Sequence, residues 1–300
     1  MVVTILTDEL KAEIYLQNLK DSLKVQLENL DLHEKVTAIA PLKKRLSPLR
    51  YPGGKSRMID YLSTLLRPEK CDTLISPFLG GGAFEISLLE AGVAKKLILN
   101  DLDYGIYSLW WTILHMPDTL ISRIESFKPT HKAFFQAQQL IKSDYRHLDM
   151  LEAAWITLLV NRLAYSGIAK ANPLGGKNGD IKSLTSRWNP RTLISRINGI
   201  YALADKIEIH CEDAVTFIEN HFWEENATLF IDPPYFEKGH ALYNLFFTEK
   251  DHINLAWTLQ TIHDSFPSSD VIVTYDFHDF IDGIYNKVEQ REVIGRQYSI

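Results

Sequence analysis

The residues best suited to chemistry stand in a row, Asp232-Pro233-Pro234-Tyr235, directly after the apolar segment 228–231. Two prolines remove two N–H donors and fix φ, so the turn is rigid and presents carbonyl oxygens. The Asp232 carboxylate and a proline carbonyl then offer two acceptors beside the flat ring of Tyr235. This set matches an amino group on a purine or pyrimidine. Acceptors on both N–H bonds would draw the nitrogen lone pair out of ring conjugation and make the nitrogen nucleophilic. The alternative is a proline-rich turn at a strand end with an exposed aspartate.

A second candidate site is the glycine loop Pro77-Phe78-Leu79-Gly80-Gly81-Gly82, between an expected strand and an expected helix. Glycines at a helix start let a ligand approach backbone N–H groups closely. Gly80-x-Gly82 half-fits the dinucleotide fingerprint, whose third glycine is replaced by Glu85. Asp101 lies about 20 residues further on, where an acidic residue holds ribose hydroxyls. The pattern predicts a ribose-bearing cofactor, either a nicotinamide or S-adenosylmethionine; a plain glycine-rich crossover turn is the alternative.

Gly54-Lys55-Ser56 matches the last three residues of the phosphate-binding loop pattern. The full pattern places a glycine five residues before Gly54, where this chain has Leu49. No hydrophobic strand precedes the segment either. The sequence therefore excludes a nucleoside-triphosphatase site and leaves Lys55 free to pair with a carboxylate.

The elements around these motifs alternate between strand and helix, which predicts an α/β, Rossmann-like fold with a parallel sheet. Expected strands cover 73–75, 96–101, 206–211, 228–231, 271–275 and 287–294. Expected helices cover 8–32, 83–91, 107–115, 131–142, 149–160, 192–203 and 249–262, with a short one ending near Leu66.

The region 104–203 is helical and surrounds a Gly-, Asn- and Lys-rich segment, 169–188, which is too long and strand-poor for a single crossover. We therefore expect three parts. They are an N-terminal helical extension over 1–45, an α/β domain built from 46–104 and 204–300, and an inserted, mostly helical subdomain over 105–203.

Composition excludes several classes of protein. The 300 residues are 46% hydrophobic and 23% charged, which argues against a disordered or low-complexity chain. Two cysteines cannot build a disulfide framework or a cysteine-rich zinc site, and no stretch reads as a signal peptide or a membrane span. His131, His147 and His240 lack paired metal-ligand spacing, so no metal site is expected. A reducing, cytoplasmic setting is the default expectation.

The net charge of −6 is unevenly distributed. Segments 41–60 and 161–200 carry +5 and +6, whereas 201–300 carries −12. Two basic islands in an acidic protein fit a local footprint for a polyanion, and two solvated loops are the alternative.

Taken together, the motifs resemble those of the Dam-like adenine-specific DNA methyltransferases, in the family's order from about Tyr51 to Ile300. The family has an aromatic-x-Gly-Gly-Lys motif, a Pro-Phe-x-Gly-x-Gly loop, an acidic residue for the cofactor ribose, another near the cofactor adenine, and Asp-Pro-Pro-Tyr. The resemblance implies that S-adenosylmethionine is bound by Tyr51, Gly54, Lys55, Phe78, Gly80, Gly82, Asp101, Asp213 and Asp232. It assigns catalysis to Asp232, Pro233, Pro234 and Tyr235.

The resemblance implies a mechanism and a partner. An adenine is flipped out of double-stranded DNA, stacks on Tyr235 and bonds Asp232 and the Pro233 carbonyl through its amine, which receives the methyl group. The family places target recognition in the insert, where Arg and Lys can read guanine or hold phosphates. The expected DNA-binding residues are Arg162, Lys170, Lys177, Lys182, Arg187 and Arg191. The resemblance also suggests a bacterial or phage-encoded, nucleoid-associated protein with a role such as restriction–modification.

Two features depart from the family. The N-terminal extension precedes its usual start, and the leucine stripe at 16–30 packs on the catalytic domain or on a partner, including a second copy. The chain also ends where the family continues with another strand. Rival functions are a methyltransferase of the same fold acting on RNA or on a protein glutamine, and a catalytically silent cofactor-binding subunit.

Overall fold

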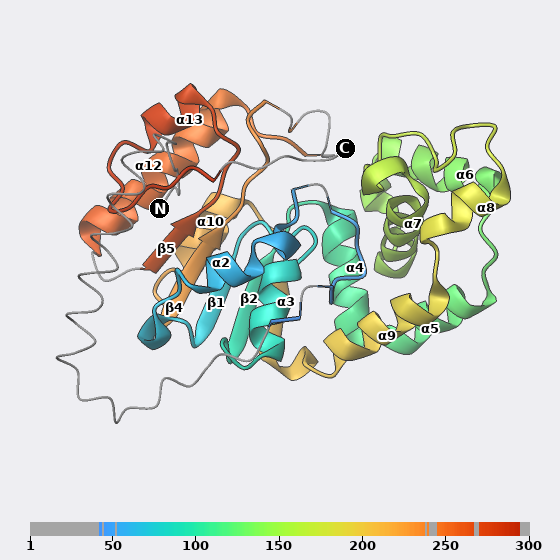
Figure 1. Cartoon of the computed structure of the whole chain (residues 1–300), viewed down its shortest axis with the longest axis horizontal. Coiled ribbons are helices and arrows are strands. Elements are labelled where there is room, and N and C mark those ends of the chain that lie inside the picture. The colour runs from blue at the N-terminus through green and yellow to red at the C-terminus, as the bar shows by residue number, and fades with distance from the viewer. Residues whose placement is uncertain are drawn as a thin grey trace, which may run out of the picture.

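A five-stranded parallel sheet organises the protein (Figure 1). The structure, a computed structural model, describes residues 42, 43, 45–51, 53–237, 239, 245–266 and 270–294. The expected helix over 8–32 lies outside these residues. The strand order is β3-β2-β1-β4-β5. The strands are β1 Thr73–Ser76, β2 Lys96–Asn100, β3 Ile207–His210, β4 Ala227–Ile231 and β5 Asp270–Val273. The expected parallel α/β sheet is confirmed.

Each face of the sheet packs against its own helices, because side chains alternate along a strand. Leu74 and Leu97 belong to one core with α2 and α3, whereas Ile75 and Ile98 belong to a second core with α10, α12 and α13. These helices are α2 Ile59–Ser63, α3 Ala83–Glu90, α10 Ala214–His221, α12 Glu249–Ser265 and α13 Asp279–Ile284. The result is a sheet covered on both faces, whose polar sites must lie at the strand ends.

The segment between β2 and β3 is helical, as expected. It comprises α4 Tyr104–His115, α5 Pro117–Ser126, α6 His131–Lys142, α7 Met150–Leu163, α8 Ile181–Leu184 and α9 Pro190–Tyr201. Helix α4 packs on α7 and α9 and also contacts β3. Ile113 of α4 and Leu158 of α7 share one hydrophobic core with Leu97 of the sheet. The core thus runs from the sheet into the helices, and the expected subdomain boundary stays a prediction.

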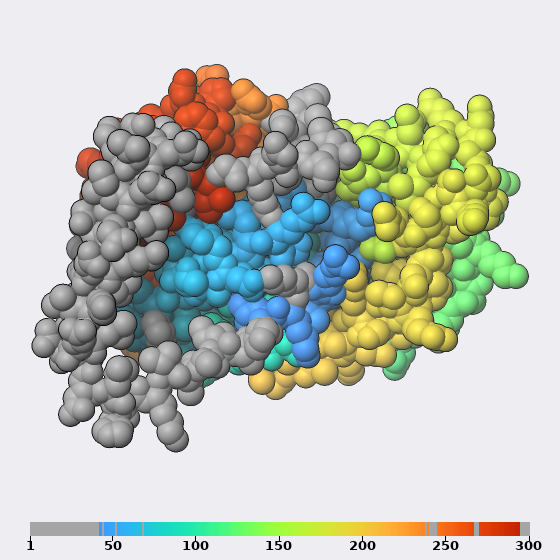
Figure 2. Space-filling view, in the orientation of Figure 1, coloured from blue at the N-terminus to red at the C-terminus, as the bar shows by residue number. Residues whose placement is uncertain are grey.

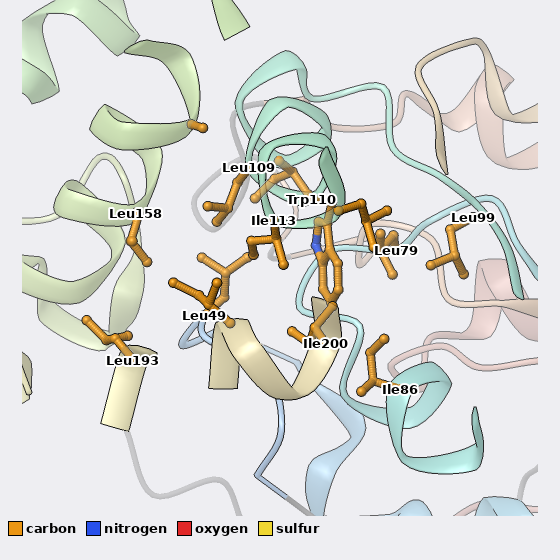
Figure 3. Packing of buried hydrophobic residues seen from close by; sticks show 14 of the residues in the cluster. Leu49, Leu79, Ile86, Leu99, Leu109, Trp110, Ile113, Leu158, Leu193 and Ile200 are labelled. Carbon is orange, nitrogen blue, oxygen red and sulfur yellow. The ribbon is translucent and has the colours of Figure 1, made fainter. Parts of the chain in front are cut away.

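In Figure 2 the dark-blue atoms of segment 45–51 lie at the border between the light-blue part of the α/β region and the yellow part of the helical region. Leu49, 7% exposed, lies with Ile113 of α4 and Leu193 of α9 in the hydrophobic core (Figure 3). The next residues along the chain enter the predicted cofactor motif. Leu49 therefore anchors that motif to the helical region.

Arginine side chains fix the backbone of the same segment. Arg196 Nη1 donates to the Ser47 carbonyl over 2.8 Å, and Arg50 Nη1 donates to the Ala164 carbonyl over 3.1 Å. Asn161 accepts from the Arg50 N–H and donates to the Arg50 carbonyl, over 2.8 and 2.9 Å. These bonds replace the sheet partners that an extended segment would otherwise need.

The expected strand over 287–294 is wrong. Its residues form bends and coil, with one isolated bridge residue at Val293. Arg291 instead donates to the side chain of Asp282 and to the backbone carbonyl of Tyr285, which ties this segment to α13. Among the described residues, the helices α5, α8, α10 and α13 were not expected.

Truncating the anchor tests whether segment 45–51 contributes to the core. Leu49→Ala removes a buried side chain, so we expect the free energy of unfolding to fall by about 2–5 kcal/mol in urea titrations. Ile181→Ala is the control, because Ile181 is 53% exposed, and we expect a change below about 0.5 kcal/mol. Equal losses in the two variants would contradict the packing described here.

Candidate active site

The strand order reverses between β1 and β4, and open α/β sheets bind ligands at the carboxyl ends of strands at such a point. β1 ends at Ser76 and leads into the glycine loop, and β4 ends at Ile231 and leads into Asp232. The topology therefore brings the two motifs together, although about 150 residues separate them along the chain. Both line one pocket of about 620 Å³.

Asp232 is held by two residues from outside its own motif. Lys55 Nζ lies 2.5 Å from Asp232 Oδ1, and the Thr274 hydroxyl donates to the same oxygen over 2.7 Å. The Lys55 and Asp232 side chains are 8% and 19% exposed, so this ion pair is largely shielded from water. Among the described residues, no donor bonds Oδ2, which leaves this oxygen available to a ligand.

Tyr235 is buried beside the pocket rather than on its lining. Its hydroxyl donates to the Gly53 carbonyl over 3.3 Å, and Lys55 Nζ lies 5.5 Å from the ring centroid. Gly53 has φ +77°, and a Cβ at this position would collide with the Tyr235 hydroxyl. Pro233 is also buried, whereas Pro234 lines the pocket.

The glycine loop has the close packing that its sequence predicts. Gly80 and Gly82 have φ of +47° and +58°, in the left-handed region that favours glycine. A Cβ on Gly80 would approach the Tyr51 ring to 2.6 Å. Trp110 Nε1 donates to the Gly80 carbonyl over 3.1 Å, and Gly82 caps the N-terminus of α3. The loop's conformation is thus fixed by Tyr51 on one side and Trp110 on the other.

Asp101 follows β2 and fixes two backbone segments of the pocket. Its carboxylate accepts from the Gly80 N–H over 2.7 Å and from the Asp103 N–H over 2.9 Å. Burial, with a smaller contribution from Asp103, raises the pKa of Asp101 to about 7. Asp213 likewise accepts from the N–H groups of Val215 and Thr216 at the start of α10.

All the residues predicted to bind the cofactor line this pocket. Of the residues predicted to bind DNA, two line the pocket and four do not. The cofactor set on the lining is Tyr51, Gly54, Lys55, Phe78, Gly80, Gly82, Asp101, Asp213 and Asp232. Of the DNA set, Arg162 and Arg187 line it, while Lys170, Lys177, Lys182 and Arg191 are exposed elsewhere on the insert.

Arg162 is a buried residue, 8% exposed, whose guanidinium donates to the carbonyls of Arg187 and Pro48. Burial first, then repulsion from Arg196, Arg50 and Arg187, lowers its pKa to about 10. Its contacts position the insert against segment 45–51. Its predicted role in DNA binding stays a prediction.

Several residues of the pocket were missed from the sequence. Arg45, Arg50 and Arg196 line it together with Arg162 and Arg187, and none of the five has an ion-pair partner within the described ranges. Thr274 and Glu85 were missed too. Thr274 follows β5, the neighbour of β4, so its position at the same sheet edge was a usable signal.

One group outside the pocket could hold a metal ion. Ligand atoms of His210, Glu212 and His221 lie within 4.8 Å of one another in the described structure. His131 and His147 are not in this group, and His240 lies outside the described residues. Of the helices that the structure describes, none is both long and apolar enough to span a membrane.

The strand order of the parallel sheet reverses beside a glycine loop, an acidic residue that follows the next strand, and an Asp-Pro-Pro-Tyr turn. This combination defines a Rossmann-like methyltransferase. The family model for the D12 class N6 adenine-specific DNA methyltransferases matches residues 51–300, and the chain belongs to this family. It is a DNA adenine methyltransferase.

Two curated relatives agree with this assignment. The chain is 21% identical over 202 residues to the type II methyltransferase M.MjaIII of Methanocaldococcus jannaschii. The match covers 62% of this chain and 68% of the relative. It is also 21% identical over 244 residues to the type II methyltransferase M.CviBI of Paramecium bursaria Chlorella virus NC1A. That match covers 79% of this chain and 85% of the relative.

A methyl group on Gly53 should displace Tyr235 and Lys55 from their positions. We expect Gly53→Ala to lower kcat/KM for methyl transfer at least about tenfold, a loss of roughly 1.4 kcal/mol in transition-state stabilisation. The control is Gly92→Ala, because Gly92 also has positive φ, +73°, but has open space around its Cβ position. Both variants bear the backbone strain of about 1–2 kcal/mol in stability. An equal fall in kcat/KM would show that strain alone is responsible.

Proposed function

We propose that the protein transfers the methyl group of S-adenosylmethionine to the exocyclic amine of an adenine flipped out of double-stranded DNA. The observation that carries this proposal is the shared pocket, in which the glycine loop and Asp232 lie at one switch point. A cofactor bound by the glycine loop would meet a target amine bound at Asp232 without either having to move across the protein.

The residues of the pocket fit the proposed cofactor. Gly80 and Gly81 lack the Cβ atoms that would collide with Tyr51, so Tyr51 lies directly against the loop backbone and both form part of the pocket lining. Asp101 supplies carboxylate oxygens for ribose hydroxyls, and Tyr51 and Phe78 supply aromatic surface. When bound, the cofactor supplies an electrophilic methyl group on a sulfonium.

Asp232 is the proposed acceptor for the target amine. Lys55 and Thr274 both bond Oδ1 and so fix the orientation of the carboxylate, which leaves Oδ2 for an N–H of the amine. The Pro233 carbonyl is the proposed acceptor for the other N–H. The nitrogen would form its new bond to the methyl carbon as the bond from that carbon to the donor's sulfur breaks and leaves a neutral thioether. The nitrogen would also give up one proton, for which the Asp232 carboxylate is the adjacent acceptor. The fixed acceptors need no reorganisation during the reaction.

Part of the pocket lining is apolar. Pro234, Phe246 and Phe247 line it, and such surfaces are suited to an unstacked base. Lys170 of the insert lies over the Phe246 ring at 6.0 Å. The proposed DNA-reading insert therefore meets the proposed base pocket. Stacking of the base on Tyr235 itself requires that this buried ring be exposed when DNA binds.

The cations of the insert support double-stranded DNA as the substrate. Lys170, Lys177, Lys182, Arg187 and Arg191 are exposed, and Arg187 is also one of the five arginines on the pocket lining. In an otherwise acidic protein, such a local cluster favours a polyanion over a neutral substrate.

Asp232→Asn keeps the shape of the side chain but removes its charge. We expect transfer of labelled methyl from S-adenosylmethionine to adenine in unmethylated duplex DNA to fall about 10²–10³-fold, because the fixed acceptor is lost. Asp264→Asn, a half-exposed surface carboxylate, is the control and should retain wild-type transfer. Transfer by the wild type to RNA or to a protein glutamine, and not to DNA, would contradict the proposal. Cofactor binding without transfer to any substrate would point to a silent subunit.

Arg187→Gln tests the DNA surface. Arg187 is exposed and lines the pocket rim, so we expect it to contact a phosphate. Its loss should reduce the slope of log K against log salt for duplex binding by about 0.9. Lys206→Gln is the control. Lys206 is an exposed cation just before β3, at the amino ends of the strands, whereas the pocket lies at their carboxyl ends. An unchanged slope for Arg187→Gln would exclude this phosphate contact.

A further inference from the structure

Glu85 is a buried carboxyl group that the mechanism above does not use. It stands in the first turn of α3, is 3% exposed and lines the cofactor pocket. The Ser76 hydroxyl, itself fully buried at the end of β1, donates to Glu85 Oε1 over 2.9 Å. Within the described part of the chain, Glu85 has no ion-pair partner. A buried carboxylate without a cation is unfavourable, so its presence in a binding pocket calls for a ligand.

The electrostatics of Glu85 are set by the pocket. Burial has the largest influence on its pKa and raises it. The hydrogen bonds from its own backbone N–H and from Ser76 lower the pKa, Asp232 raises it and Lys55 lowers it, and the net result is a pKa of about 7. Lys55 does not neutralise Glu85, because Lys55 Nζ is bonded to Asp232 and to the Gly53 carbonyl. At neutral pH the carboxyl is therefore divided between its protonated and ionised forms.

Stabilising the helix does not explain this residue. An acidic side chain favours a helix N-terminus only when it is ionised, and here burial opposes ionisation. The glycine fingerprint has a third glycine where this chain has Glu85, so the backbone does not require an acid. Binding of a ligand explains both why an acidic residue occurs at position 85 and why its side chain lies in the pocket.

We propose that Glu85 binds the positively charged methionine end of S-adenosylmethionine, and that it releases its proton to solvent when the cofactor binds. This inference rests on the proposed function. S-adenosylmethionine carries a sulfonium and an ammonium against one carboxylate, a net charge of +1. Its demethylated product, S-adenosylhomocysteine, has lost the sulfonium and is neutral overall. A carboxylate beside this end therefore distinguishes the methyl donor from the spent product.

The methionine end is the part of the cofactor that Glu85 can meet. The methyl group must lie beside the amine held at Asp232, and Asp232 and Lys55 are the two charged residues that act on Glu85. Asp101, the other carboxyl of the pocket with a pKa near 7, is held by the Gly80 and Asp103 N–H groups and faces the expected ribose site. The ribose is common to donor and product, so Asp101 does not discriminate between them.

The sign of the pH dependence follows from the charge. Below pH 7 Glu85 is protonated, and binding a cation must first remove the proton. Affinity for S-adenosylmethionine should rise with pH, by up to about tenfold per unit below pH 7, and level off above it. Affinity for S-adenosylhomocysteine should rise less, so the preference for donor over product should grow between pH 6 and pH 8.

Calorimetry measures both consequences in the full chain without turnover. Titrations of the two ligands in buffers of different ionisation enthalpy report the protons released, and titrations from pH 6 to pH 8 report affinity. For the wild type we expect more proton release with S-adenosylmethionine than with S-adenosylhomocysteine. In Glu85→Gln the two values should become equal, and the rise in donor preference with pH should disappear.

Three variants make the test specific. Glu90→Gln, on the same helix but outside the pocket, should behave as the wild type. Asp101→Asn should change binding of both ligands alike. Ser76→Ala removes the hydrogen bond that favours the ionised form, so the pH at which donor affinity levels off should move upward. This last shift reports on Glu85 even if Glu85→Gln does not fold.

The outcomes separate the inference from the proposed function. A wild type that binds S-adenosylmethionine with no excess proton release over S-adenosylhomocysteine overturns the role of Glu85 and leaves the proposed function intact. The role of Glu85 is also overturned if Glu85→Gln releases as many more protons with S-adenosylmethionine than with S-adenosylhomocysteine as the wild type does. A wild type that binds neither ligand overturns both.

Discussion

The ion pair between Lys55 and Asp232 is the interaction on which the site depends. It joins residues 177 positions apart, one in the turn before α2 and the other after β4. Both side chains are largely buried, and removal of one partner from such a pair costs about 3–5 kcal/mol. The same lysine contacts the Gly53 carbonyl, to which Tyr235 also donates. One cation therefore sets the positions of the acceptor carboxylate and of the aromatic ring.

Segment 45–51 extends this coupling to the helical region. Leu49 is anchored among the helices, Arg50 is bonded to Asn161 and Ala164, and Tyr51 packs on the glycine loop. A shift of the insert would thus be transmitted along three consecutive residues to the glycine loop and the proposed cofactor site. The continuous core between insert and sheet makes such a shift a repacking event rather than a free hinge motion.

The fold and most of the site could be predicted from the sequence, because motifs at strand ends are brought together by any parallel sheet. Asp232, Gly80 and Asp101 needed only that rule. Glu85 could not be assigned, since its burial arises from packing of α3 on the sheet. Arg162 was predicted to bind DNA because it begins the basic segment of the insert. The apolar run 153–160 that precedes it was a usable signal that this part of α7, and Arg162 with it, is buried. The expected strand over 287–294 failed because Arg291 holds the chain against α13.

The distribution of charge in the pocket has a chemical logic that single motifs do not reveal. Acidic groups, Glu85, Asp101 and Asp232, gather at the sheet edge, and five arginines gather toward the insert. A cationic methyl donor and a polyanionic substrate would each find the opposite charge on its own side of one cavity. If both ligands bind as proposed, this distribution would favour one mutual orientation, with the donor's charge turned away from the arginines.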